Sequence, residues 1–261
     1  EILLDNTDRN RTSPFAFTGN KFEFRAVGSW ANCAKPMTVL NTIVAKQLKE
    51  FKIEVDHLID TKNLKKDEAV FNVLREYIKE SKKIRFEGDG YGEPWEKEAK
   101  KRGLSNNKTT PEALKVKISK KAIDLFEEMD VMNKVELEAR FEIAIEEYTK
   151  RLQIESRVLG DLSRNHVIPT AIIYQNTLLE NTKNLKEIFG EEYKNIAKEQ
   201  IELIMTISNH ITEINALTLK MVDERRKANK FTGIKSAEMY CKNVIPFFEQ
   251  IRYNCDKLET M

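Results

Sequence analysis

The sequence predicts an α+β protein: a short antiparallel β-hairpin that belongs to a larger sheet, followed by a mainly α-helical C-terminal region. Glycine and proline gather before about residue 112 and become sparse afterwards, and aromatic residues alternate with other types near residue 20. Apolar residues recur at three- and four-residue steps in the second half. The change in composition predicts one part over residues 1–110 and a second over 111–261.

The predicted hairpin spans residues 11–27. Aromatic residues alternate on both sides of the turn residues 18–20, at Phe15, Phe17, Phe22 and Phe24. Two registers are compatible with this pattern, and the first, with a two-residue turn, pairs Phe17 with Phe22. In that register Arg11 faces away from Glu23, whereas a three-residue loop puts both side chains on one face.

Helices account for most of the remaining chain. The expected ranges are 37–49, 65–80, 111–130, 134–162, 166–188, 191–228 and 235–258. Three glycines among residues 88–92 predict a loop over 85–95. Within 191–228, an apolar seam is interpreted as core, with a subunit contact as the alternative. Its members are Ile204, Ile207, Ile211, Ile214 and Met221.

Composition excludes several classes of function. Lys and Arg number 44 against 42 Asp and Glu, and the charges interleave, so no nucleic-acid partner is expected. No apolar run approaches the roughly 18 residues of a membrane span, so no membrane partner is expected. The three cysteines lack metal or disulfide spacing, which favours a reducing, cytoplasmic location. Because the chain begins at Glu1 and not at methionine, we expect a fragment of a longer protein.

The second predicted strand carries the densest chemistry. Side chains alternate across a strand, so Lys21, Glu23 and Arg25 share the face opposite the aromatic side chains. A carboxylate oxygen is a hard ligand for Mg²⁺ or Mn²⁺, and guanidinium groups bind phosphate oxygens in a fork. Arg11 on the partner strand adds a second guanidinium. A metal–nucleotide site is one interpretation, and a solvated strand face with cross-strand ion pairs is the other.

Residues 10–29 also carry a family resemblance. Asn10-Arg11-Thr12, followed by the strand Glu23-Phe24-Arg25, resembles the late catalytic segment of glutamine synthetases, in particular the type III branch. Residues 88–95, 102–104, 165–171 and 174–176 resemble the C-terminal region of the same branch. The resemblance implies that residues 1–110 are the C-terminal part of a glutamine synthetase catalytic domain, whose hairpin belongs to a larger catalytic sheet. Residues 111–261 would then be its helical C-terminal region.

The resemblance implies ATP-dependent ligation of ammonia to L-glutamate through a γ-glutamyl phosphate, with Mg²⁺ or Mn²⁺ as cofactor. By that resemblance Glu23 is a metal ligand, and Arg11 and Lys21 bind the phosphates of ATP. Arg25 orients the glutamate, and Arg11 and Arg25 are the catalytic residues. Other branches have a further phosphate-binding arginine five positions after the one matched by Arg11, and this chain has Ala16 there.

The resemblance also implies a homo-oligomer of stacked rings. The family's other metal ligands and its nucleotide loop precede this segment, so the isolated chain is expected to be inactive. In the alternative function, the protein is a non-catalytic helical scaffold or oligomerisation module, and its hairpin has only a structural role. Glu23→Gln separates the two, because a scaffold tolerates the change and a ligase does not.

Overall fold

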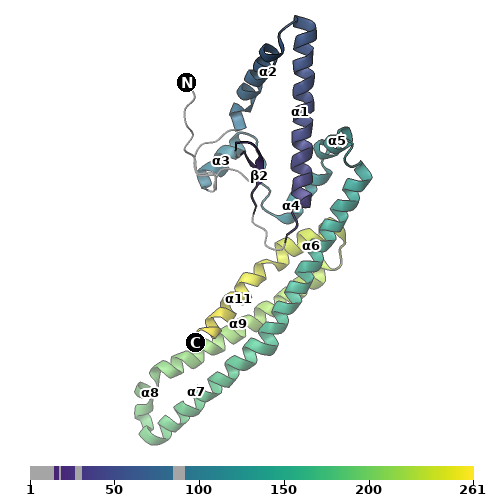
Figure 1. The fold of residues 1–261 in the computed structure, drawn as a ribbon. Coiled ribbons are helices and arrows are strands. Elements are labelled where there is room, and N and C mark those ends of the chain that lie inside the picture. The colour runs from purple at the N-terminus through teal and green to yellow at the C-terminus, as the bar shows by residue number, and fades with distance from the viewer. Residues whose placement is uncertain (1–14, 18, 27–30, 85–91) are drawn as a thin grey trace, which may run out of the picture. The chain divides into compact units, whose positions relative to one another are not determined.

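The structure is a computed structural model that describes residues 15–17, 19–26, 31–84 and 92–261. A two-stranded antiparallel sheet is followed by helices, which confirms the predicted fold class (Figure 1). The chain divides into two compact units, Glu1–Lys108 with Ile118–Leu137, and Thr109–Lys117 with Glu138–Met261. The functional division at residues 110 and 111 stays a prediction. Among the described residues, none of the helices combines the length and the apolar character that a membrane span requires.

The hairpin of the first unit consists of β1 (Phe15–Phe17) and β2 (Phe22–Phe24). The antiparallel register pairs Phe15 with Phe24, Ala16 with Glu23, and Phe17 with Phe22. This is the first of the two registers that the sequence allowed. Gly19 in the turn has a φ of 98°, a left-handed conformation that glycine adopts without a Cβ clash. The outer parts of the predicted strands, residues 11–14 and 27, lie outside the described residues.

The first unit also contains a helical hairpin of α1 (Ala34–Lys62) and α2 (Lys66–Ser81). The predicted helix over 37–49 continues to Lys62, because apolar residues at four- and three-residue steps pack against α2. Phe51, Val55 and Leu58 make that contact around the buried Ala69 and Val73. Asn63 ends α1 with a φ of 52°, which asparagine tolerates better than most residues.

Two of the segments that differ from the sequence expectation are short. Part of the expected loop over 85–95 is helical, since α3 (Glu93–Lys101) begins with proline in its first turn, where a missing N–H costs nothing. The expected helix over 111–130 is split into α4 (Thr110–Lys115), a 3₁₀ turn (Val116–Ile118) and α5 (Lys120–Glu128). The break occurs because the Ser119 hydroxyl accepts a hydrogen bond from the Ala122 N–H at 3.3 Å and caps a new helix.

The second unit is a helical bundle. Its elements are α6 (Lys134–Leu162), a π turn (Ser163–Val167), α7 (Ile168–Phe189), a 3₁₀ turn (Gly190–Glu192), α8 (Tyr193–Ile196), α9 (Lys198–Ala228), α10 (Gly233–Met239), a second π turn (Tyr240–Val244) and α11 (Pro246–Glu259). The first four residues of α6 belong to the first unit. Each π turn lies just before a proline, Pro169 or Pro246, which lacks the N–H that would continue the helical ladder.

The core of the bundle is centred on α9, which packs against α11 and α7 (Figure 1). Ile207, Ile214 and Met221 of the predicted seam are at most 1% exposed, so their interpretation as core is confirmed. Ile214 and Met221 belong to a cluster of ten buried residues: Leu152, Ile168, Ile214, Leu217, Met221, Ala228, Tyr240, Val244, Ile251 and Cys255.

Candidate functional site

Glu23 and Arg25 lie on one face of the hairpin, as the alternation of a strand requires. The Arg25 Nη2 donates a hydrogen bond to the Glu23 Oε2 at 3.0 Å. The two side chains are 40% and 27% exposed, so the pair is partly shielded but open to a ligand. Phe15 and Phe22 stack with ring centroids 4.5 Å apart, as expected for the aromatic face.

The residue opposite Glu23 is small and uncharged. Ala16 pairs with Glu23 across the sheet and is 7% exposed. Within the described residues, Glu23 forms an ion pair along its own strand with Arg25. Arg25 is thus the guanidinium that sets the position of the Glu23 carboxylate.

The other two predicted site residues are less defined. Lys21 directly precedes β2, two residues before Glu23, and it is exposed. Arg11 lies outside the described residues, and the observed register is the one in which strand alternation alone would turn it away from Glu23. The roles assigned to Lys21 and Arg11 stay predictions.

The donor set for a metal ion is incomplete in the described part of the chain. Among the described residues there is no group of three or more His, Cys, Asp or Glu that could hold a metal. A single carboxylate at Glu23 has the hard oxygen chemistry that Mg²⁺ or Mn²⁺ prefers. The residues therefore fit one ligand of a shared site, and further ligands would have to come from elsewhere.

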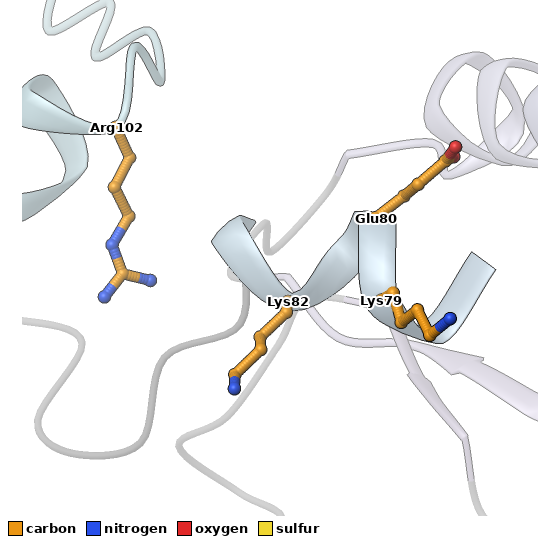
Figure 2. A pocket seen from close by; sticks show the side chains of 4 residues that line it. All are labelled: Lys79, Glu80, Lys82 and Arg102. Atoms are coloured by element: carbon orange, nitrogen blue, oxygen red, sulfur yellow. The ribbon is translucent and has the colours of Figure 1, made fainter. Parts of the chain in front are cut away.

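An open cavity of about 880 Å³ lies near the segment that resembles the type III branch, lined by Lys79, Glu80, Lys82 and Arg102. Figure 2 shows these side chains pointing in different directions, without a common focus. Lys79 pairs with a glutamate one turn earlier at 2.7 Å, and Arg102 pairs with Glu98 at 2.6 Å.

Arg102 has a structural role on α3. It lies 5.7 Å from the centre of the Trp95 ring, and its hydrogen bond holds the pKa of Glu98 below its ordinary value. These contacts tie the two ends of α3 together. The cavity is consequently a weaker candidate than the hairpin face.

A second group of cations was missed by sequence reasoning. Arg157, Arg164 and Arg225 line a cavity of about 390 Å³ in the second unit. The spacing of Arg157 and Arg164 by seven residues was a signal that they share one helical face. Arg225 is in the last turn of α9, where cations are common, and only packing shows that it lines the same cavity.

The fold and the Glu23–Arg25 face define a protein in which a charged hairpin precedes a helical C-terminal bundle. Residues 69–186, from within α2 to within α7, match the family profile described as the glutamine synthetase C-terminal domain. Over its whole length the chain is similar to glutamine synthetases, which confirms the resemblance to that family, type III included.

Three relatives are similar over nearly all of this chain. It is 49% identical over 261 residues to a glutamine synthetase of Bacteroides fragilis (strain YCH46), covering 99% of this chain and 36% of that protein. It is 36% identical over 260 residues to the type-3 glutamine synthetase of Dictyostelium discoideum, covering 98% and 35%. It is 29% identical over 262 residues to a glutamine synthetase of Butyrivibrio fibrisolvens, covering 98% and 36%. The chain thus spans about a third of the length of the curated relatives it matches.

Proposed function

We propose that this chain supplies part of the active site of an ATP-dependent glutamate–ammonia ligase. In that reaction a γ-carboxylate oxygen of glutamate attacks the γ-phosphorus of ATP, and ADP leaves. Ammonia then attacks the acyl carbon, loses a proton and displaces phosphate to give glutamine. The observation that carries the proposal is the partly shielded Glu23–Arg25 pair on a strand that resembles the family's catalytic segment. The similarity to glutamine synthetases over 99% of the chain supports it.

Glu23 acts as a metal ligand in this proposal. Within the described residues its Oε2 takes the hydrogen bond from Arg25, which leaves Oε1 for a cation. A bound Mg²⁺ or Mn²⁺ supplies the positive charge that the transferring phosphoryl group needs. Because the Arg25 contact fixes the carboxylate, Oε1 is presented in one orientation before any ligand arrives.

Arg25 also orients the carboxylate of glutamate, as the resemblance to the family implies, because a planar guanidinium and a carboxylate can pair in a forked arrangement. Lys21 and Arg11 neutralise the phosphates of ATP. Since Ala16 adds no charge opposite Glu23, these cations and the metal must supply the neutralisation that an arginine gives in other branches.

The remaining properties follow from the same proposal. The intact protein works as a cytoplasmic homo-oligomer of stacked rings, with glutamate, ammonia and ATP as substrates. The isolated chain is inactive, because in the resembled family the other metal ligands and the nucleotide loop precede this segment. Residues 1–110 are the C-terminal part of the catalytic domain, and residues 111–261 are the helical C-terminal region.

The test is Glu23→Gln in the full-length protein that contains this chain. We measure phosphate release from ATP that depends on both glutamate and ammonia, across a range of Mg²⁺ and Mn²⁺ concentrations. Replacing a charged ligand with a neutral amide is expected to lower kcat/KM by about 100-fold or more, while assembly is unchanged.

Glu98→Gln is the matched control. Glu98 accepts a hydrogen bond from Arg102 at 2.6 Å, with side chains 35% and 24% exposed, so it resembles the Glu23–Arg25 pair in type and exposure. Its loss should leave the activity nearly unchanged. Equal losses in both variants would remove Glu23 from the metal site. An unmutated protein with no ligase activity would favour the helical scaffold.

A further inference from the structure

The cavity in the second unit that contains Arg157, Arg164 and Arg225 has features of a ligand site. Its volume of about 390 Å³ lies within the ordinary range for small-molecule pockets. Its walls come from α6, the first π turn, the start of α7 and α9. All of these elements belong to the second unit apart from the first four residues of α6, which do not line the cavity.

The charges of the cavity are not balanced. Within the described part of the chain, none of the three arginines has a carboxylate within 4.0 Å, whereas the next residue, Arg226, pairs with Asp223 at 3.3 Å. One carboxylate, Asp161, lines the cavity, and its Oδ1 accepts a hydrogen bond from the Asn165 amide at 2.6 Å. Three guanidinium groups against one carboxylate leave an excess of positive charge.

Arg225 is the most confined of the three cations. Burial lowers its pKa, and the neighbouring charges of Arg157 and Arg226 lower it further. Arg157 is exposed and Arg225 is half-buried, so their repulsion is only partly screened by solvent, and an anion between them would relieve it. The arrangement therefore has an energetic cost that a bound anion would offset.

The cavity also has an unsatisfied polar group. The Thr218 hydroxyl is buried, in a side chain 1% exposed, and has no hydrogen-bond partner among the described residues. Thr206 and Thr212 on the same helix donate to carbonyls four residues earlier, at 2.8 and 2.9 Å. The Thr218 hydroxyl makes no such hydrogen bond within the described residues, and leaving a buried hydroxyl unpaired is unfavourable.

The π turn contributes side chains to two cavities. Arg164 and Asn165 line this one, whereas His166 and Val167 line a separate cavity of about 470 Å³. The wider turn carries an extra residue, which redirects side chains away from the positions of a regular α-helix. Such turns occur often at functional sites.

We propose that Arg157, Arg164 and Arg225 bind a small molecule carrying at least two anionic groups, phosphoryl or carboxylate. Guanidinium groups bind both in a fork, and Asn165 and Asn215 add neutral polar groups from opposite walls. The ligand links α6 to α9 and so stabilises the bundle when it binds. This site is separate from the hairpin face and does not depend on the ligase proposal.

The test is titration calorimetry and thermal unfolding of the 261-residue chain at fixed ionic strength. Pyrophosphate is the phosphoryl probe and citrate the carboxylate probe, with chloride as reference. We expect saturable binding of at least one probe, with one molecule per chain, and a higher Tm in its presence. If neither probe binds saturably, the proposal is wrong.

Single substitutions locate the site. Arg157→Gln and Arg225→Gln should each weaken binding about tenfold or more, because each removes a charge-assisted contact. Arg151→Gln is the control: it removes an exposed arginine of the same helix, paired with Glu147 at 3.1 Å and outside the cavity. If Arg151→Gln weakened binding as much as the two cavity variants do, binding would depend on general surface charge, and the proposal would be wrong.

A second readout separates binding from a structural role. Without an anion, Arg225→Gln should leave the Tm unchanged or raise it, because repulsion with Arg157 is relieved. With the anion, the same variant should lack the rise in Tm that the unmutated chain shows. A lower Tm of equal size under both conditions would mean that Arg225 holds the bundle together without a ligand, which contradicts the proposal.

Discussion

The two units differ in how their cores are built. The helical hairpin of the first unit has a cluster of three buried residues, Val55, Ala69 and Val73, whereas the bundle of the second unit has a cluster of ten. Counted over the described residues, the candidate catalytic hairpin belongs to the unit with the smaller buried cluster. Since buried apolar area is the main source of stability, the chain's resistance to unfolding should reside in the second unit.

The largest effect is expected in the core of the bundle. Ile214→Ala removes a fully buried side chain from α9 and should lower the free energy of unfolding by about 2–5 kcal/mol. Hydrogen exchange measured segment by segment should show the loss across α7, α9 and α11. Unchanged protection there, with a loss in α1 and α2, would reverse the comparison between the units.

An intermediate effect is expected where the first unit relies on a polar contact. The Tyr77 hydroxyl donates to Glu54 Oε1 at 2.8 Å and links α2 to α1. Tyr77→Phe should cost about 0.5–1 kcal/mol, because the acceptor can turn to water. The measurement is the protection of α1 and α2 from hydrogen exchange. An equal loss of protection in the bundle would show that the two units do not unfold independently.

The same residue predicts a pH dependence. Burial and then the hydrogen bond to Glu54 raise the pKa of Tyr77 to about 12, from an ordinary value of 10.0. The folded state thus holds this proton more tightly than the unfolded state, so the contribution is full below pH 10 and is lost as the pH rises through 12. Tyr77→Phe should make the fall in protection of α1 and α2 over that interval less steep. An identical fall in both proteins would assign it to other groups.

An effect of similar size but opposite sign concerns a glycine near the C-terminal end of α6. A Cβ at Gly160 would meet the Thr218 Cγ2 at 3.5 Å and the Met221 Cε at 3.7 Å, which are ordinary contacts. Gly160→Ala should raise the stability of the bundle by about 0.5–1 kcal/mol, since alanine favours the helix. Chemical denaturation checks it, and a decrease would show that α6 and α9 have no room for the methyl group.

Much of the fold was predictable from local pattern. The helix over 134–162 follows from apolar periodicity and is confirmed, whereas the turn residues left two hairpin registers open, of which the structure has the one that pairs Phe17 with Phe22. The break at Ser119 was missed, although serine is a common helix cap, because its neighbours are compatible with a continuous helix. The extension of α1 depends on α2, a partner that a local window does not contain.

The candidate sites show the same limit. Alternation along one strand placed Glu23 and Arg25 on one face, and the structure confirms it. The three arginines of the cavity come from two distant stretches of sequence, so no spacing within one stretch could bring them together. Arg225 joins the other two through the packing of α9 against the π turn that leads into α7.

The π turn at Ser163–Val167 also affects how homologous chains should be aligned. An α-helix turns through about 100° and rises about 1.5 Å with each residue, so an extra residue absorbed in one turn rotates everything that follows. A heptad count started in α6 therefore assigns the wrong faces to α7. A single-residue deletion within the turn would leave a continuous helix but swing Ile168 out of the core.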